Sequence, residues 1–364
     1  MLAGEWAVLE VGVPCVVAAI DKNVSVRLSK SNSDSISVWA PDLELKEKKA
    51  KFDGKQLLWK PELNSEEKEK LLIASHAIAI TLQYLKAKAK KIRNFRIETG
   101  SEDCVVKLAD GAIKKIGFGS SAAACVGIVR AILEFHEIKS RTKRELETVF
   151  KLACMAHFEA QGKVGSSFDV AASTFGGLLL YKRFDPKWLE DQAKAGNTVA
   201  QIVDAAWPSL QIESLEIPKN FQFLIGFTGP DSSTKEMIRK MNLAKETQKD
   251  KYERIIEDIQ KTVEELVIAI QKNDPKKIIS KLKEDRKALQ ALSRISGLEL
   301  ETQKLAVLAD IAEQAGGSGK FSGSGGGGLG IGICFDEKTG EKIRQNWKKN
   351  GIEVVEAGIA KSVL

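Results

Sequence analysis

A short glycine- and serine-containing segment has the composition of an anion-binding loop. It reads Gly117-Phe118-Gly119-Ser120-Ser121-Ala122 and runs directly into the apolar stretch 123–133. Glycine lets a backbone approach a ligand closely, and Ser120 and Ser121 are good N-terminal caps with free hydroxyls. The first amide groups of the following helix, and the positive end of its dipole, suit a polyphosphate. The segment therefore predicts a phosphate site at the start of a helix.

A second polar loop, residues 162–169, carries a single carboxylate. This is Asp169, which follows Ser166 and Ser167. Capping of a short helix beginning at Val170 would explain an aspartate at this position. The functional alternative is a general base, which takes a proton from an acceptor hydroxyl or orients the acceptor for in-line attack. The residue pattern leaves both alternatives open.

Residues 316–330 form a third candidate segment, which is very rich in glycine and includes Gly325, Gly326 and Gly327. A flexible linker is the simplest interpretation of such a composition. However, the stretch joins an apolar-faced helix directly to an expected strand at 329–335, so we expect it to lie inside a domain. A loop with so few side chains would let its backbone approach another loop or a bound phosphate.

Neither glycine-rich segment fits the two common nucleotide-binding patterns. Phe321 follows Lys320 where the Walker A pattern needs Ser or Thr, and no strand precedes that segment. Gly117 and Gly119 are followed by Ala122, which breaks the Gly-x-Gly-x-x-Gly pattern of dinucleotide-binding folds. Both of those folds are therefore excluded.

Periodicity predicts the elements that position these loops. We expect strands at 11–20, 24–28, 93–98, 104–108, 178–181, 222–228, 329–335 and 352–356, and helices at 64–90, 120–135, 142–161 and 337–350. The stretch 232–315 is helical by pattern, with breaks near Asn242, 273–275 and 296–297. It opens with a polar cluster in which Ser233 and Thr234 could cap the helix or hold an anionic group. Strands followed by helices in each half predict two α+β domains, divided as 1–200 and 201–364.

The composition describes a globular protein. It is 43% apolar and 29% charged, and no apolar run is long enough to span a bilayer. The five cysteines lack Cys-x-x-Cys spacing, so we expect a reduced, cytoplasmic protein without a structural zinc site. His157 lies in a helical pattern and is expected to be a core or boundary residue rather than a metal ligand. The net charge of +7 comes without a basic block interleaved with aromatics, so no nucleic-acid partner is expected.

Taken together, these segments resemble the GHMP kinase superfamily and, within it, the phosphomevalonate kinase family. The three superfamily motifs appear in order at 2–9 (Leu-Ala-Gly-Glu-Trp-Ala-Val-Leu), 117–123 and 322–330. Residues 160–171 and 206–229 narrow the resemblance to phosphomevalonate kinases. The resemblance spans nearly the whole chain. It implies a two-domain α+β fold, with an S5-like N-terminal domain and a ferredoxin-like C-terminal domain.

The resemblance also implies cofactors and roles. ATP would lie across residues 117–122, with Ser120 as a phosphate contact and Ser121 as the ligand of Mg²⁺. Lys114 or Lys115 would neutralise charge on the transferred phosphoryl group. Asp169 would face the acceptor phosphate of (R)-5-phosphomevalonate. The residues implied to bind this small-molecule partner are Ser166, Ser167, Ser233, Thr234, Gly325, Gly326 and Gly327.

Two positions depart from the family pattern. A Gly-Lys pair precedes the Ala-Gly-Glu motif in the family, and its lysine would fall just before Met1. We favour a natural start further upstream over a shortened, impaired chain. Gly328-Leu329 stand where many members have Asp-Cys. The alternatives are therefore another GHMP kinase that accepts an alcohol, such as a mevalonate kinase, and a GHMP-fold protein that binds a metabolite without catalysis. The oligomeric state does not follow from the sequence.

Overall fold

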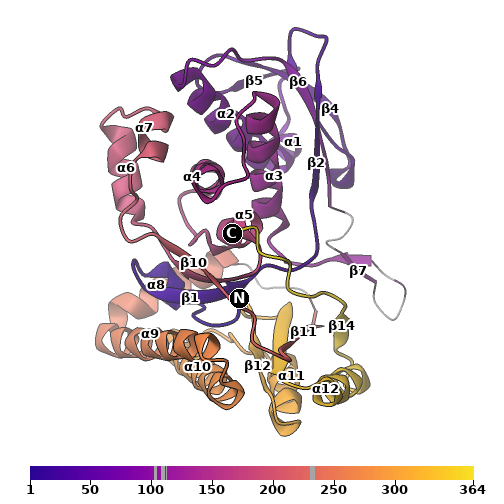
Figure 1. Ribbon diagram of the computed structural model, residues 1–364, viewed down its shortest axis with the longest axis vertical. Helices are drawn as coiled ribbons and strands as arrows, with labels where there is room; N and C mark the ends of the chain where they lie inside the picture. The colour runs from indigo at the N-terminus through magenta and orange to yellow at the C-terminus, as the bar shows by residue number, and fades with distance from the viewer. Residues whose placement is uncertain (102–104, 108–110, 112, 230–233) are drawn as a thin grey trace.

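The computed structural model describes residues 1–101, 105–107, 111, 113–229 and 234–364 (Figure 1). Its strands are β1 (Pro14–Ala18), β2 (Ser25–Lys30), β3 (Ile36–Ala40), β4 (Leu45–Phe52), β5 (Leu57–Lys60), β6 (Phe95–Gly100), β7 (Val105–Lys107), β8 (Ile113–Lys115), β9 (Leu178–Lys182), β10 (Gln211–Leu215), β11 (Gln222–Phe227), β12 (Ser318–Phe321), β13 (Leu329–Cys334) and β14 (Glu353–Val355). Its α-helices are α1 (Ser65–Lys70), α2 (Leu72–Ala87), α3 (Ser120–Phe135), α4 (Lys143–Ala160), α5 (Phe168–Phe175), α6 (Pro186–Lys194), α7 (Val199–Asp204), α8 (Thr234–Thr247), α9 (Lys249–Gln271), α10 (Pro275–Ser296), α11 (Gln303–Gln314) and α12 (Glu337–Lys349). In the described part of the chain, no helix combines the length and apolar character needed to cross a membrane.

The first part of the chain forms a five-stranded sheet with the order β2-β6-β3-β4-β5. Helices α2, α3 and α4 pack together beside it (Figure 1), and their apolar faces join the strands in one core. Helix α1, which directly precedes α2, begins with a capping box at Asn64, and α4 begins with one at Thr142. In a capping box the side chains of the first and fourth residues satisfy each other's backbone amides, which explains where these helices start.

A small antiparallel sheet, β1-β9-β10, lies between the two halves of the molecule. Side chains alternate across a strand. On β9, Leu179 and Tyr181 therefore face the core shared with α3 and α4, whereas Leu178 and Leu180 face the core shared with α9 and α10. Strand β1 divides its residues in the same way. Strands β1 and β9 are buried on both faces, so they belong to both cores.

The C-terminal sheet has the order β12-β13-β11-β14, with every neighbouring pair antiparallel. Helices α8 to α11 connect β11 to β12, and α12 connects β13 to β14. This β-α-β-β-α-β succession is the ferredoxin-like arrangement, so that expectation is confirmed. Helices α9 and α10 lie side by side at one end of the molecule (Figure 1).

Several element boundaries differ from the sequence predictions. The helical stretch breaks at Gln248, not near Asn242, because Asn242 is exposed and tolerated inside α8. The predicted helix at 64–90 is interrupted at Leu71. Helices α6 and α7 were not predicted, although Asp185-Pro186 is a cap followed by proline and Thr198 opens a capping box. The predicted division at 200/201 stays a prediction.

Candidate active site

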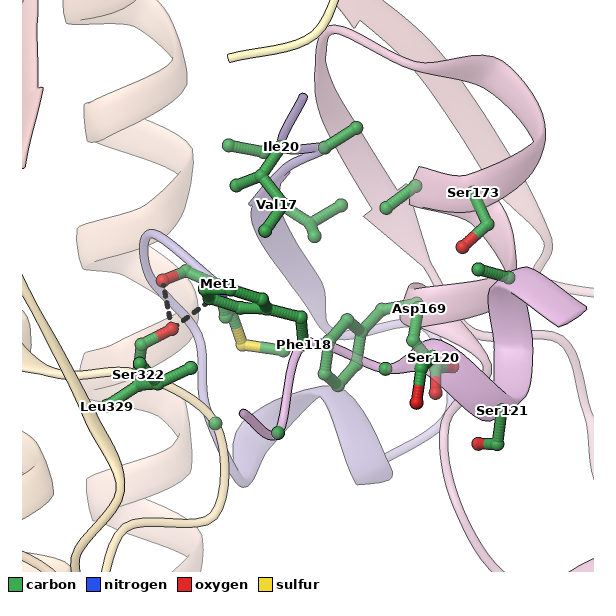
Figure 2. A pocket seen from close by; sticks show the side chains of 18 of the residues that line it. Met1, Val17, Ile20, Phe118, Ser120, Ser121, Asp169, Ser173, Ser322 and Leu329 are labelled. Atoms are coloured by element: carbon green, nitrogen blue, oxygen red, sulfur yellow. Dashed lines mark hydrogen bonds between the residues drawn. The ribbon is translucent and has the colours of Figure 1, made fainter. Parts of the chain in front are cut away.

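A cavity of about 1030 Å³ lies where β1, the start of α3, the start of α5 and the glycine-rich loop between β12 and β13 meet. Figure 2 shows these elements converging on the space. The predicted site residues that line it are Gly117, Phe118, Gly119, Ser120, Ser121, Ser166, Ser167, Asp169, Gly325 and Gly327. Three loops that are distant in the sequence therefore share one cavity.

The first loop presents the unpaired start of α3 to the cavity. Gly119 is the N-cap residue and has a φ of 77°, a left-handed conformation that glycine adopts easily. No side chain caps this helix, so its first amide groups and its dipole are available to a ligand. The expectation that Ser120 and Ser121 are caps is wrong, because both lie inside the first turn. Ala122 is fully buried behind them.

Asp169 lies in the first turn of α5. The N-cap residue is Ser167, with a φ of 62°, so the interpretation of Asp169 as the cap is wrong. Its Oδ1 atom accepts a hydrogen bond of 2.9 Å from the Val170 amide. A Cβ atom built on Gly119 would lie only 3.4 Å from the Cβ of Asp169, and Figure 2 shows Asp169 beside Ser120. The Asp169 side chain and the uncapped start of α3 are therefore direct neighbours.

Tyr181 supports the loop that leads into α5. Its hydroxyl donates a hydrogen bond of 2.6 Å to the backbone carbonyl of Ser166. Burial raises the pKa of Tyr181 well above its ordinary value, so the hydroxyl keeps its proton and remains a donor. Sequence reasoning missed this residue because an apolar strand containing one tyrosine does not reveal which loop the tyrosine contacts.

His157 holds the hydroxyl of Ser121. It lies on α4, is 2% exposed, and places Nε2 3.2 Å from Ser121 Oγ. The amide nitrogen of Gln161 lies 3.3 Å from the same Nε2. Because an amide NH₂ group only donates, Nε2 is an acceptor here, and the Ser121 hydroxyl donates to it. The expectation of a core or boundary position for His157 is confirmed by its burial, and its contact with Ser121 was not predicted.

The glycine-rich segment is the loop of a β-hairpin. Strands β12 and β13 pair antiparallel on either side of it, so the linker interpretation is wrong. Gly325 adopts a φ of 76°, and a Cβ atom there would lie 2.4 Å from the Leu300 carbonyl oxygen. Gly326 donates its amide to that same carbonyl at 2.8 Å and lies outside the cavity lining. The loop thus approaches the Leu300 backbone too closely for side chains at this point.

Four further predicted site residues cannot be placed fully. Ser233 lies outside the described residues, and Thr234 begins α8. Lys114 and Lys115 lie in β8, opposite Val106 and Val105 of β7, and their side chains lie outside the described part of the chain. The roles of these four residues stay predictions.

The donors at the cavity fit Mg²⁺ held jointly with a nucleotide. Among the described residues, no three His, Cys, Asp or Glu side chains gather as a metal site. Mg²⁺ is commonly held by one or two carboxylates together with substrate phosphates and waters, so a full protein cage is not required. The Asp169 carboxylate and the Ser121 hydroxyl supply the kind of oxygen donors that such an ion uses.

Comparison with known proteins identifies the family. Residues 58–177 match the GHMP kinases N terminal domain, and residues 266–353 match the GHMP kinases C terminal domain. The chain is 29% identical over 357 residues to a phosphomevalonate kinase from Streptomyces sp. (strain CL190), covering 96% of this chain and 92% of that protein. The chain therefore belongs to the GHMP kinases.

Two solved structures extend the match. The structure of the Lin0012 protein from Listeria innocua is 30% identical, has a TM-score of 0.87, and covers 99% of this chain and 96% of its own. The phosphomevalonate kinase of Streptococcus pneumoniae, in complex with phosphomevalonate and AMPPNP, is 22% identical with a TM-score of 0.82. The second match covers 98% of this chain and 96% of that one, and it shows that the two share a fold.

Proposed function

We propose that this chain is an ATP-dependent phosphomevalonate kinase. It would transfer the γ-phosphoryl group of ATP to (R)-5-phosphomevalonate, giving 5-diphosphomevalonate and ADP in the mevalonate route to isoprenoids. The observation that carries the proposal is the contact between the open start of α3, at Gly119, and Asp169 in a single cavity. The full-length similarity to a phosphomevalonate kinase supports the choice of acceptor.

The start of α3 would bind the phosphates of ATP. Its uncapped amide groups, which begin at Ser120, supply donors, and its dipole adds positive potential. Ser121 would contribute its oxygen to Mg²⁺, because its proton is already donated to His157. When bound, Mg²⁺ supplies charge neutralisation on the phosphate oxygens. Lys114 or Lys115 would add a further positive charge.

Asp169 would orient the acceptor phosphate. The second pKa of a phosphate monoester is near 6, so the attacking oxygen is largely ionised at neutral pH. A strong base is therefore less important than it would be for an alcohol, and positioning with charge neutralisation dominates. Asp169 takes any remaining proton and aligns the acceptor. Ser166, Ser167, the Ser233–Thr234 segment and the loop at Gly325–Gly327 would bind the rest of the acceptor.

We place this reaction in the cytoplasm, with a small molecule as the partner rather than nucleic acid or a membrane. Four cysteines in the described part of the chain, Cys15, Cys125, Cys154 and Cys334, are buried free thiols. Free thiols are typical of reducing compartments, which supports this placement.

The proposal is tested by steady-state assays of the purified protein with mevalonate and phosphomevalonate as separate acceptors. We expect ADP release only with phosphomevalonate, and ³¹P NMR should show a new diphosphate. Turnover of mevalonate alone would mean that the chain is an alcohol-specific GHMP kinase. ATP binding without transfer to either acceptor would favour a metabolite-binding protein that lacks catalysis.

A further inference from the structure

Three charged side chains form a buried cluster under the glycine-rich loop. Glu5 and Asp285 are 0% exposed and Lys320 is 1% exposed. The Lys320 ammonium donates to Glu5 Oε1 and lies 3.4 Å from Asp285 Oδ2. Apolar residues of similar size can often replace such buried clusters without loss of stability. Stability alone therefore does not explain why three charges lie here.

The cluster connects two walls of the cavity. Asp285, on α10, accepts a hydrogen bond of 3.3 Å from the Gly4 amide, in the N-terminal turn whose Glu5 and Trp6 line the cavity. Lys320, on β12, donates at 3.0 Å to the carbonyl of Phe321, the residue directly before the glycine-rich loop. Asp285 thus contacts both the backbone of the N-terminal turn and the Lys320 ammonium, which in turn bonds the backbone next to the glycine-rich loop.

Two further contacts show that these walls rest on each other. The indole Nε1 of Trp6 donates to the carbonyl of Ser324 at 3.2 Å. The hydroxyl of Ser322 donates to the carbonyl of Met1 at 3.0 Å, which Figure 2 shows at the edge of the cavity. A change of spacing at the buried cluster would therefore be transmitted to residues 322–328, which line the cavity in part.

We propose that Asp285 is a positioning residue for the acceptor side of the active site. It does not line the cavity, and it acts through Lys320 and the Gly4 amide. It sets the spacing between the N-terminal turn and the glycine-rich loop. The inference rests on the proposed function in one respect, namely that this loop receives the acceptor.

Asp285→Asn is the sharpest variant, because asparagine keeps the shape and an acceptor for the Gly4 amide but places an NH₂ group, which cannot accept, opposite the Lys320 ammonium. Lys281→Met is the matched control on the same helix. Lys281 pairs with Glu265 and Glu284, and none of these three residues lines the cavity.

Hydrogen exchange without any ligand gives the first readout. We expect amides in 322–328 to exchange about tenfold faster in Asp285→Asn than in the wild type, with no change there in Lys281→Met. Wild-type exchange in this loop would overturn the proposal. If Asp285→Asn does not fold, the triple variant Glu5→Gln/Lys320→Met/Asp285→Asn, which carries no charge in the cluster, takes its place. We expect the same tenfold faster exchange in 322–328, and wild-type exchange there would again overturn the proposal.

Kinetics give the second readout. We expect the KM for phosphomevalonate to rise about fivefold in Asp285→Asn, while the KM for ATP and kcat stay within about twofold. Loss of kcat alone, in proportion to the unfolded fraction, would reduce Asp285 to a purely structural role and overturn the proposal. If the loop exchange rises but the wild type does not phosphorylate phosphomevalonate, the proposed function fails and the positioning role stands.

Discussion

The two glycine-rich loops at the cavity are built on different principles. The loop that ends at Gly119 opens a helix, and the amides of that helix start have no side-chain cap. The loop at 322–328 joins two strands and is already bonded to its surroundings. Gly326 donates to Leu300, and Gly328 accepts from the Thr228 amide at 2.8 Å. The first loop leaves its donors for a ligand, whereas the second uses its backbone to hold its own shape.

Glycine is therefore required for different reasons in the two loops. At Gly119 the positive φ turns the chain into the helix, and a Cβ atom there would still fit in van der Waals contact with Asp169. At Gly325 the missing side chain allows the loop to touch the Leu300 backbone. The electrostatic environment of the two loops differs as well. The first loop lies at the positive end of the α3 dipole, whereas the second lies above the buried charged cluster of Glu5, Lys320 and Asp285. Substitutions on the first side should therefore affect transfer, and those on the second side should affect acceptor binding.

The largest effect is expected for Asp169→Asn, on the side of the first loop. Asparagine keeps the size of the side chain but not the carboxylate that aligns the acceptor, so kcat should fall about a hundredfold through lost positioning. The affinity for ATP, measured by calorimetry, should stay within about twofold. Asp185→Asn is the matched control, since Asp185 caps α6 away from the cavity. Near wild-type turnover in Asp169→Asn would mean that the acceptor does not bind next to α5.

A smaller effect is expected for His157→Leu, which removes the acceptor of the Ser121 proton. The hydroxyl would then rotate freely, and the concentration of Mg²⁺ needed for half-maximal rate should rise about tenfold. Binding of Mn²⁺ with ADP, followed by electron paramagnetic resonance, should weaken by the same factor. His76→Gln serves as the control, because His76 lies on α2 outside the cavity lining. Equal Mn²⁺ affinity in wild type and His157→Leu would show that His157 has no influence on metal binding.

On the side of the second loop, Gly325→Ala should raise the KM for phosphomevalonate about fivefold. The new Cβ would meet the Leu300 carbonyl oxygen at 2.4 Å and displace the loop. Gly316→Ala is the matched control, because Gly316 also has a positive φ, of 99°, but nothing lies within 4 Å of its Cβ position. Both variants carry the cost of a left-handed alanine, about 1–2 kcal/mol. An equal KM in the two variants would show that contact with Leu300 does not shape the acceptor site.

Sequence reasoning found the parts of the site that are local. The loop at Gly117–Ala122 and the helix after it follow from neighbouring residues, and Asp169 stands in a short polar loop that is visible in the sequence. The capping roles were less accurate. Serine and aspartate are generally favoured as caps, but the cap positions went to Gly119 and Ser167, each in a left-handed conformation.

The parts that sequence reasoning missed depend on tertiary packing. Asp285 lies among lysines, glutamates and arginines in a stretch that reads as a solvated helix, and the docking of α10 on β12 and on the N-terminal turn buries it. The next residue, Arg286, is buried as well and pairs with Glu301 and Glu313. A helical period shows which residues share a face of a helix, but not which charged face the fold covers. The same limit hid the contact of His157 with Ser121.

The smallest effect is a pH dependence of stability that arises from Asp285, in the buried cluster under the second loop. Burial raises the pKa of Asp285 from 3.8 to about 7; the nearby Lys320 opposes this shift and Glu5 adds to it. The folded protein therefore keeps a proton on Asp285 at a pH where the unfolded chain has released it. Unfolding then releases a proton, and the stability that this group contributes is present at low pH and lost as the pH rises through about 7.

Urea unfolding of the wild type and Asp285→Asn across this range isolates the contribution, because asparagine does not titrate. The difference in unfolding free energy, wild type minus variant, should grow by on the order of 1 kcal/mol from pH 8 to pH 6. Groups that titrate elsewhere in the chain cancel in this difference as long as the variant keeps the fold. A difference that stays constant over this range would mean that Asp285 is ionised throughout, so that its attraction to Lys320 outweighs the cost of burial. The two walls of the acceptor site would then be held by a full ion pair at every pH at which the protein folds.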